Sequence, residues 1–103
     1  MVISPGAHRV IHSPVMMAGK ARGAWFFEGT SHVKLLDGNG KEVTEWVPAH
    51  AKADGMTNDW VPFEATIEFT APATATGTLL LQNDNPSGLP ENQEELWLSV
   101  RFK

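Results

Sequence analysis

The amino-acid sequence predicts an all-β fold, an antiparallel β-sandwich of about seven to eight short strands. Apolar and polar residues alternate with a period of two in the clearest segments, as in strands that bury one face. Nine glycines and seven prolines separate the short apolar runs. No amphipathic helical pattern continues beyond about two turns.

The two clearest strands lie at 63–69 and 96–102. In the first, the side chains expected on the buried face are Phe63, Ala65, Ile67 and Phe69. In the second they are Leu96, Leu98, Val100 and Phe102. The same alternation places Trp97 on the exposed face of the last strand.

Weaker strand candidates are the segments 10–12, 15–22, 25–28, 32–37, 41–47 and 78–82. Gly19 lies inside one of them and suggests a β-bulge or a close backbone approach. Asp37-Gly38-Asn39-Gly40 predicts a hairpin turn, because Gly and Asn tolerate positive φ. The number of strands in about 100 residues matches an immunoglobulin-like antiparallel β-sandwich, and a small barrel is the alternative.

The composition fits one domain that folds without covalent staples. The chain has 103 residues, of which 42% are hydrophobic, enough for a packed core. It has no cysteine, which excludes disulfides, thiolate zinc sites, iron–sulfur clusters and cysteine nucleophiles.

The charge distribution argues against nucleic acid and membrane partners. The net charge is −4, and the eight Lys and Arg residues are scattered, so no basic stripe is available for phosphates or anionic lipids. No apolar run approaches the ~18–20 residues of a membrane span, and direct membrane insertion is not expected. The first residues, Met1–Pro5, do not form a signal peptide. If the domain works outside the cytoplasm, we expect its export signal to lie upstream of residue 1.

Three stretches, taken in order, resemble the immunoglobulin-like domain of bacterial spore germination proteins. They are Ile3-Ser4-Pro5 with Ser13-Pro14-Val15 and Gly19-Lys20-Ala21; Ala21 to Glu28 running into Val33–Asp37; and Asn83 to Asn92. The resemblance covers the chain from Ile3 to Phe102. It implies an extracellular or cell-envelope location, often as a module of a lipoprotein. Under this resemblance, we expect residues 1–103 to be a single immunoglobulin-like domain of a larger envelope protein. The family defines no catalytic residues, so none can be transferred to this chain.

No residue pattern indicates an enzyme or a cofactor site. A Gly-x-Ser-x-Gly elbow is absent, and Ser87 lies in a Pro-Ser-Gly turn that builds no oxyanion hole. His8 and His12 lack the remainder of a zinc motif. We therefore expect no catalytic residue, no cofactor and no metal, with one exception.

That exception is the connection from Asn83 to Glu95. It is long for a link between two strands, and Asp84, Asn85 and Glu91 supply the hard oxygen ligands that calcium takes. The alternative is a self-supported structural loop, in which Asp and Asn side chains accept hydrogen bonds from backbone amides.

The four tryptophans are the other candidates for binding. Trp25 is expected in the core, like the tryptophan of other sandwiches. The candidate contact residues are Trp97, Trp60, Trp46 and Asn92, because exposed indoles stack on sugars and anchor protein interfaces.

The sequence therefore predicts a non-catalytic interaction or spacer module. Its expected partners are neighbouring domains of the same polypeptide or envelope proteins. A module that binds peptidoglycan or cortex glycan through exposed tryptophans is one alternative, and a calcium-stabilised adhesion-type domain is another.

Overall fold

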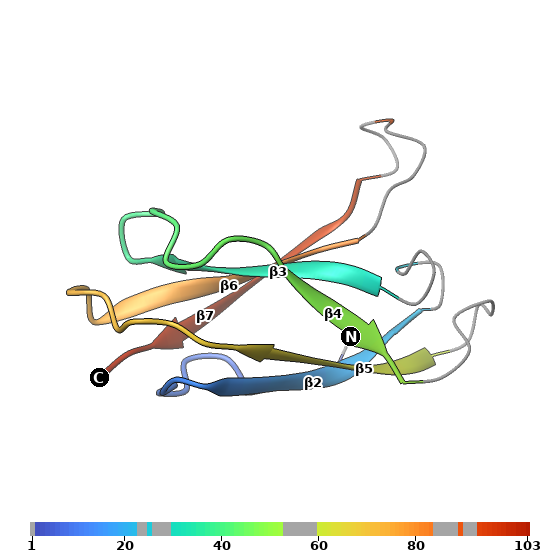
Figure 1. The fold of residues 1–103 in the computed structure, drawn as a ribbon, viewed down its shortest axis with the longest axis horizontal. Helices are drawn as coiled ribbons and strands as arrows, with labels where there is room; N and C mark the ends of the chain where they lie inside the picture. The colour runs from blue at the N-terminus through green and yellow to red at the C-terminus, as the bar shows by residue number, and fades with distance from the viewer. Residues whose placement is uncertain (1, 23–24, 26–29, 53–59, 84–88, 90–92) are drawn as a thin grey trace.

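The computed structural model describes residues 2–22, 25, 30–52, 60–83, 89 and 93–103 of the chain (Figure 1). Within these residues the fold is all-β, as predicted. Its seven strands are β1 (Val2–Ser4), β2 (Val15–Arg22), β3 (Thr30–Asp37), β4 (Val47–Ala51), β5 (Trp60–Ile67), β6 (Thr76–Gln82) and β7 (Glu95–Arg101).

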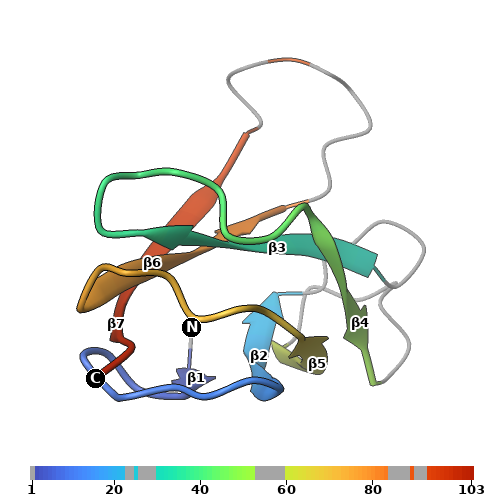
Figure 2. The same cartoon turned by 60° about the vertical axis from the view of Figure 1, so that its left-hand side comes forward.

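The strands form one curled sheet in the order β1-β2-β5-β4-β3-β6-β7, with every neighbouring pair antiparallel. β4 joins the two halves of the sheet, because it pairs with β3 at Ser31↔Ala49 and with β5 at Ala51↔Phe63. The sheet folds over at β4, so that β1, β2 and β5 face β3, β6 and β7 (Figure 2). This division matches the two sheets of an immunoglobulin-like sandwich.

The segment between β1 and β2 links the two layers at the opposite side. β1 pairs with β2 in the first layer, and the chain then reaches β7 in the second layer, where Val10 and Arg101 form a parallel bridge. The Ile11 amide donates to the Arg101 carbonyl at 2.9 Å, and the Arg101 amide donates to the Arg9 carbonyl at 2.8 Å. The edge of β7 around Arg101 is therefore already paired with residues 9–11.

Alternation of side chains builds the core between the layers. In β5, Val61, Phe63, Ala65 and Ile67 are buried and the residues between them are exposed. In β7, Val100 is buried, whereas Leu96 and Leu98 are partly buried against the core. The inward faces predicted for these two strands are confirmed. Ile11, Val15, Met17, Val33, Leu35, Leu79, Leu81 and Phe102 complete the centre.

Gly77 is the small residue that lets Phe102 close one end of the core. A Cβ added to Gly77 would lie 2.6 Å from Cε2 and 2.8 Å from Cζ of Phe102, and would also collide with the Leu36 carbonyl. The Phe102 ring meets Phe69 edge-on, with the ring centres 5.9 Å apart. Only glycine leaves room for this ring.

The turn at 37–40 has the predicted hairpin chemistry. Oδ1 of Asp37 accepts hydrogen bonds from the amides of Asn39 (2.8 Å) and Lys41 (2.9 Å). Gly40 has a φ of 80°, a conformation that other residues adopt only with strain. The Gly40 amide donates to the Asp37 carbonyl at 3.1 Å.

Three expectations about strands were wrong. The segment 10–12 makes only an isolated bridge at Val10 and is not a strand. Of the candidate strand 25–28 only Trp25 is described, and it belongs to no strand. The register of β2 with both neighbours continues through Gly19, which lies opposite Ile3 and Phe63, so there is no bulge. The strand expected at 41–47 begins only at Val47, because the chain makes a single bridge to β3 at Glu42 and then turns away. Oγ1 of Thr44 accepts a hydrogen bond from the Leu35 amide at 3.0 Å. This side-chain oxygen replaces the backbone carbonyl that a neighbouring strand would supply.

Candidate binding face

The outer surface of β3, β6 and β7 carries the largest group of binding candidates. Because Val33, Leu35, Leu79 and Leu81 point into the core, the residues between them point outward. The register aligns these outward residues in three cross-strand rows, which we call the β3–β6–β7 face: His32–Gln82–Glu95, Lys34–Leu80–Trp97 and Leu36–Thr78–Ser99.

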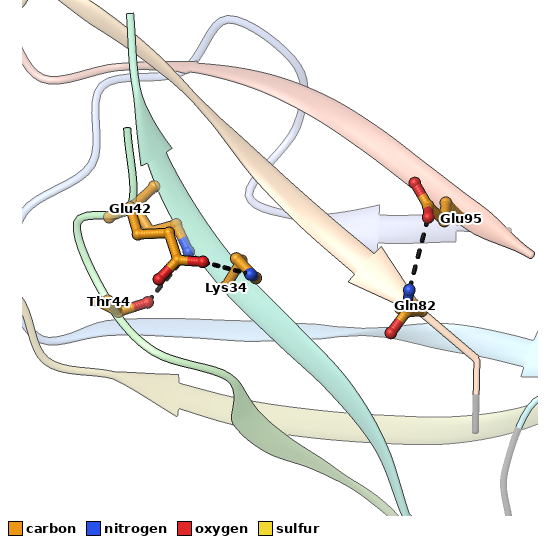
Figure 3. A network of polar contacts seen from close by, with 6 residues as sticks. Lys34, Glu42, Thr44, Gln82 and Glu95 are labelled. Carbon is orange, nitrogen blue, oxygen red and sulfur yellow. Dashed lines mark hydrogen bonds and ion pairs between the residues drawn. The ribbon is translucent and has the colours of Figure 1, made fainter. Parts of the chain in front are cut away.

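Lys34 lies at the centre of a polar and aromatic cluster at one end of the middle row. Its Nζ is 2.7 Å from Oε1 of Glu42 (Figure 3) and 4.1 Å from the ring centre of Trp46. The Lys34 side chain is only 13% exposed, whereas that of Glu42 is 59% exposed. His32 meets Trp46 edge-on, with ring centres 6.1 Å apart. These contacts hold Trp46 against the β3–β6–β7 face.

Trp97 occupies the other end of the same row. Between the two ends lies Leu80, which points outward yet is only 8% exposed, since Lys34 and Trp97 stand opposite it on the neighbouring strands. Trp97 is 58% exposed and Trp46 is 39% exposed. With strands about 4.8 Å apart, the row forms a continuous strip with an exposed indole at each end.

The row His32–Gln82–Glu95 lies next to this strip. It is polar and leads to the connection between β6 and β7. Nε2 of Gln82 lies 3.4 Å from Oε1 of Glu95 (Figure 3). Next to this pair, Oδ1 of the buried Asn83 accepts hydrogen bonds from the Glu94 amide at 2.9 Å and from Nε2 of Gln93 at 3.1 Å. Asn83 therefore ties the start of the connection to Glu94 near its end. The structural-loop alternative stays a prediction, because residues 84–88 and 90–92 lie outside the described part of the chain.

A groove lies beside Trp97 on the third row. It has a volume of about 330 Å³, and its lining includes Trp97, Thr78, Ser99, His8 and the turn residues Gly38 and Gly40. His8 has a φ of 63°, which is uncommon for a residue with a side chain. Its amide donates to the Ser99 carbonyl at 2.7 Å, and this bond holds the His8 backbone against β7.

Trp60 belongs to the opposite outer surface. It is 47% exposed on β5 and pairs across the strands with Arg22, whose guanidinium carbon lies 4.6 Å from the ring centre. The nearby Lys52 and Glu64 form an exposed ion pair at 3.4 Å. Trp60 therefore cannot form one platform with Trp97.

The structure separates the candidate contact residues that the sequence analysis grouped together. Trp97 and Trp46 share the β3–β6–β7 face, whereas Trp60 does not. Asn92 and the calcium candidates Asp84, Asn85 and Glu91 lie outside the described residues. Trp25 packs partly buried against the core, as expected, and its Nε1 has no partner among the described residues.

Sequence reasoning missed Lys34, Leu80 and His8 as parts of this surface. The period of two places Lys34 on an outer face, but it does not reveal which strands become neighbours. The backbone conformation of His8 leaves no sequence signal, because glycine is the residue usually expected at positive φ.

The described part of the chain holds neither a cluster of metal ligands nor a membrane-spanning helix. No group of three or more His, Asp or Glu side chains there is arranged to hold a metal ion. No helix in that part has the length and apolar character needed to cross a membrane.

Comparison with known proteins gives one match. The family model described as the immunoglobulin-like domain of bacterial spore germination matches residues 1–88. Neither the curated proteins nor the solved structures contain a match to the chain.

Proposed function

Because the chain belongs to the family of immunoglobulin-like domains of bacterial spore germination, we propose that it is a non-catalytic interaction module of the bacterial cell envelope. In this role the domain binds a component of the envelope through its β3–β6–β7 face. The partner is presented outside the cytoplasm, on the cell surface or in the wall.

The observation that carries this proposal is the strip from Trp46 to Trp97. Two exposed indoles on one face give a large, rigid contact area with little loss of conformational entropy on binding. Between them, Leu80 and the stem of Lys34 provide an apolar floor. Interfaces concentrate their binding energy in such aromatic anchors.

The opposite surface is a weaker candidate. Trp60 is its one exposed indole among the described residues, whereas the β3–β6–β7 face carries two. The surrounding Lys52–Glu64 pair is charged and exposed, and charged residues are depleted at interface centres. Trp60 therefore serves as the matched control for Trp97.

Co-sedimentation with purified cell-wall sacculi tests the proposal. We compare the unmodified domain with Trp97→Ala, Trp46→Ala and Trp60→Ala, using sacculi that retain their covalently bound proteins and sacculi stripped of them. Binding that is lost in the first two variants and kept in Trp60→Ala supports the proposal. Equal binding by all variants, or loss only in Trp60→Ala, contradicts it.

The calcium-stabilised alternative stays a prediction, because Asp84, Asn85 and Glu91 lie outside the described residues. It predicts that millimolar calcium raises the melting temperature, since a ligand that binds only the folded state stabilises it. An unchanged melting temperature would contradict it.

A further inference from the structure

We propose that the groove beside Trp97 binds a neutral pyranose ring of an envelope glycan, stacked on the exposed indole. This inference rests on the proposed function and names the ligand class for one part of the β3–β6–β7 face. Its geometric basis is the combination of a flat aromatic surface, 58% exposed, with a groove of about 330 Å³ directly beside it.

The chemistry of the groove walls suits a sugar ring. A pyranose has an apolar C–H face and a rim of hydroxyl groups. The indole of Trp97 offers a π surface for the first, while Thr78, Ser99 and His8 line the same groove and offer hydroxyl and imidazole groups for the second. A volume near the lower end of ligand pockets, which span about 300–1,000 Å³, favours one ring over a larger group.

The charge of the groove points to a neutral ligand. Its described lining contains no Lys or Arg and a single carboxylate, that of Asp37. Oδ1 of Asp37 is occupied by the amides of Asn39 and Lys41 in the turn. A phosphate or another anionic ligand would find no Lys or Arg side chain here to pair with.

An extended peptide is also a poor fit to the groove. Peptides that add to a sheet need an unpaired strand edge. Beside the groove, the β7 edge is already occupied, because the Ser99 carbonyl accepts the His8 amide and Arg101 exchanges hydrogen bonds with Arg9 and Ile11. The ligand must therefore be recognised by side chains, as sugars are.

Isothermal titration with two soluble neutral oligosaccharides tests the inference. The probes are the β-1,4-linked tetramers of N-acetylglucosamine and of glucose. We expect at least one to bind, with Trp97→Ala weakening binding by about tenfold or more and Trp60→Ala leaving it unchanged. Ser99→Leu, which fills the groove and keeps Trp97, should also abolish binding. Circular dichroism verifies that each variant is folded.

The outcomes separate this inference from the proposed function. If neither tetramer binds at millimolar concentration, or if binding survives both Trp97→Ala and Ser99→Leu, the sugar site is refuted. The proposed function still stands in that case if sedimentation with protein-bearing sacculi requires Trp97. If sedimentation is also independent of Trp97, both the sugar site and the proposed function are refuted.

Discussion

Trp60 and Trp97 lie on opposite outer surfaces of the sandwich, although both precede an inward-facing residue in a strand with the same alternation. Trp60 is on β5 beside the inward Val61, and Trp97 is on β7 beside the inward Leu98. Since the two strands belong to different layers, their outward side chains point away from each other. A flat ligand can therefore contact only one of these indoles on a given domain.

The contact between Lys34 and Trp46 should contribute measurably to stability. Lys34→Met keeps the aliphatic stem but removes the ammonium 4.1 Å from the ring of Trp46. In a double-mutant cycle with Trp46→Leu, we expect a coupling of about 1–2 kcal/mol, because the Lys34 side chain is only 13% exposed and shielding from water strengthens a cation–π contact. Denaturant unfolding measures it. The same cycle between Lys34→Met and Trp60→Leu should be additive, and equal coupling in both cycles would refute the interaction.

Gly77→Ala should destabilise the domain by about 2 kcal/mol, because overpacked cores must shift side chains or backbone. The new Cβ would lie 2.6 Å from the Phe102 ring. Gly6→Ala is the control, since a Cβ there meets only Arg9 Cγ at 3.9 Å. Urea unfolding compares the two. If Phe102→Leu, which removes the ring but leaves the Leu36 carbonyl in place, does not reduce the loss caused by Gly77→Ala, the Phe102 ring is not the group that excludes a side chain at position 77.

The Asp37 side chain should stabilise the hairpin turn by about 1 kcal/mol, a typical contribution of such hydrogen bonds. Asp37→Ala removes the acceptor of the Asn39 and Lys41 amides. Asp37→Asn retains an oxygen at that position and should destabilise the domain less than Asp37→Ala does. Thermal unfolding gives the order of stability of the unmodified domain and the two variants. If Asp37→Asn lowers the melting temperature as much as Asp37→Ala does, the charge of Asp37 matters and not its role as a hydrogen-bond acceptor.

Asn83→Ala should lower the free energy of unfolding by about 2 kcal/mol. The substitution removes the side-chain oxygen that accepts the Glu94 amide where the β6–β7 connection starts and ends. Amide hydrogen exchange provides a local readout: exchange at Glu94 should accelerate strongly, whereas exchange at Leu35, on the other side of β6, should change only with global stability. Unchanged protection at Glu94 would contradict this role.

The sequence allowed the strand pattern to be predicted more completely than the binding surface. Alternation in 63–69 and 96–102 depends on local chemistry alone, so the inward residues and the outward Trp97 were correctly assigned. The segment 41–47 has the composition of a strand, yet the Thr44 hydroxyl competes for the Leu35 amide. That competition is a tertiary detail without a local signal.

The strip of the binding face depends on strand order, which a single sequence does not reveal. Trp46 and Trp97 are 51 positions apart in the chain and meet on one surface only because β6 lies between β3 and β7. Trp60 is exposed like Trp46 and Trp97, which is why the sequence placed all three among the contact residues. Its strand, β5, belongs to the other layer.

The most direct test of the β3–β6–β7 face is the ¹H–¹⁵N spectrum of the four tryptophan indoles during titration with solubilised cell-wall fragments. The account predicts that the Trp97 and Trp46 indole signals shift with the same dissociation constant while the Trp60 signal stays in place. A spectrum in which Trp60 alone shifts, or in which no indole responds although the fragments bind, would contradict it.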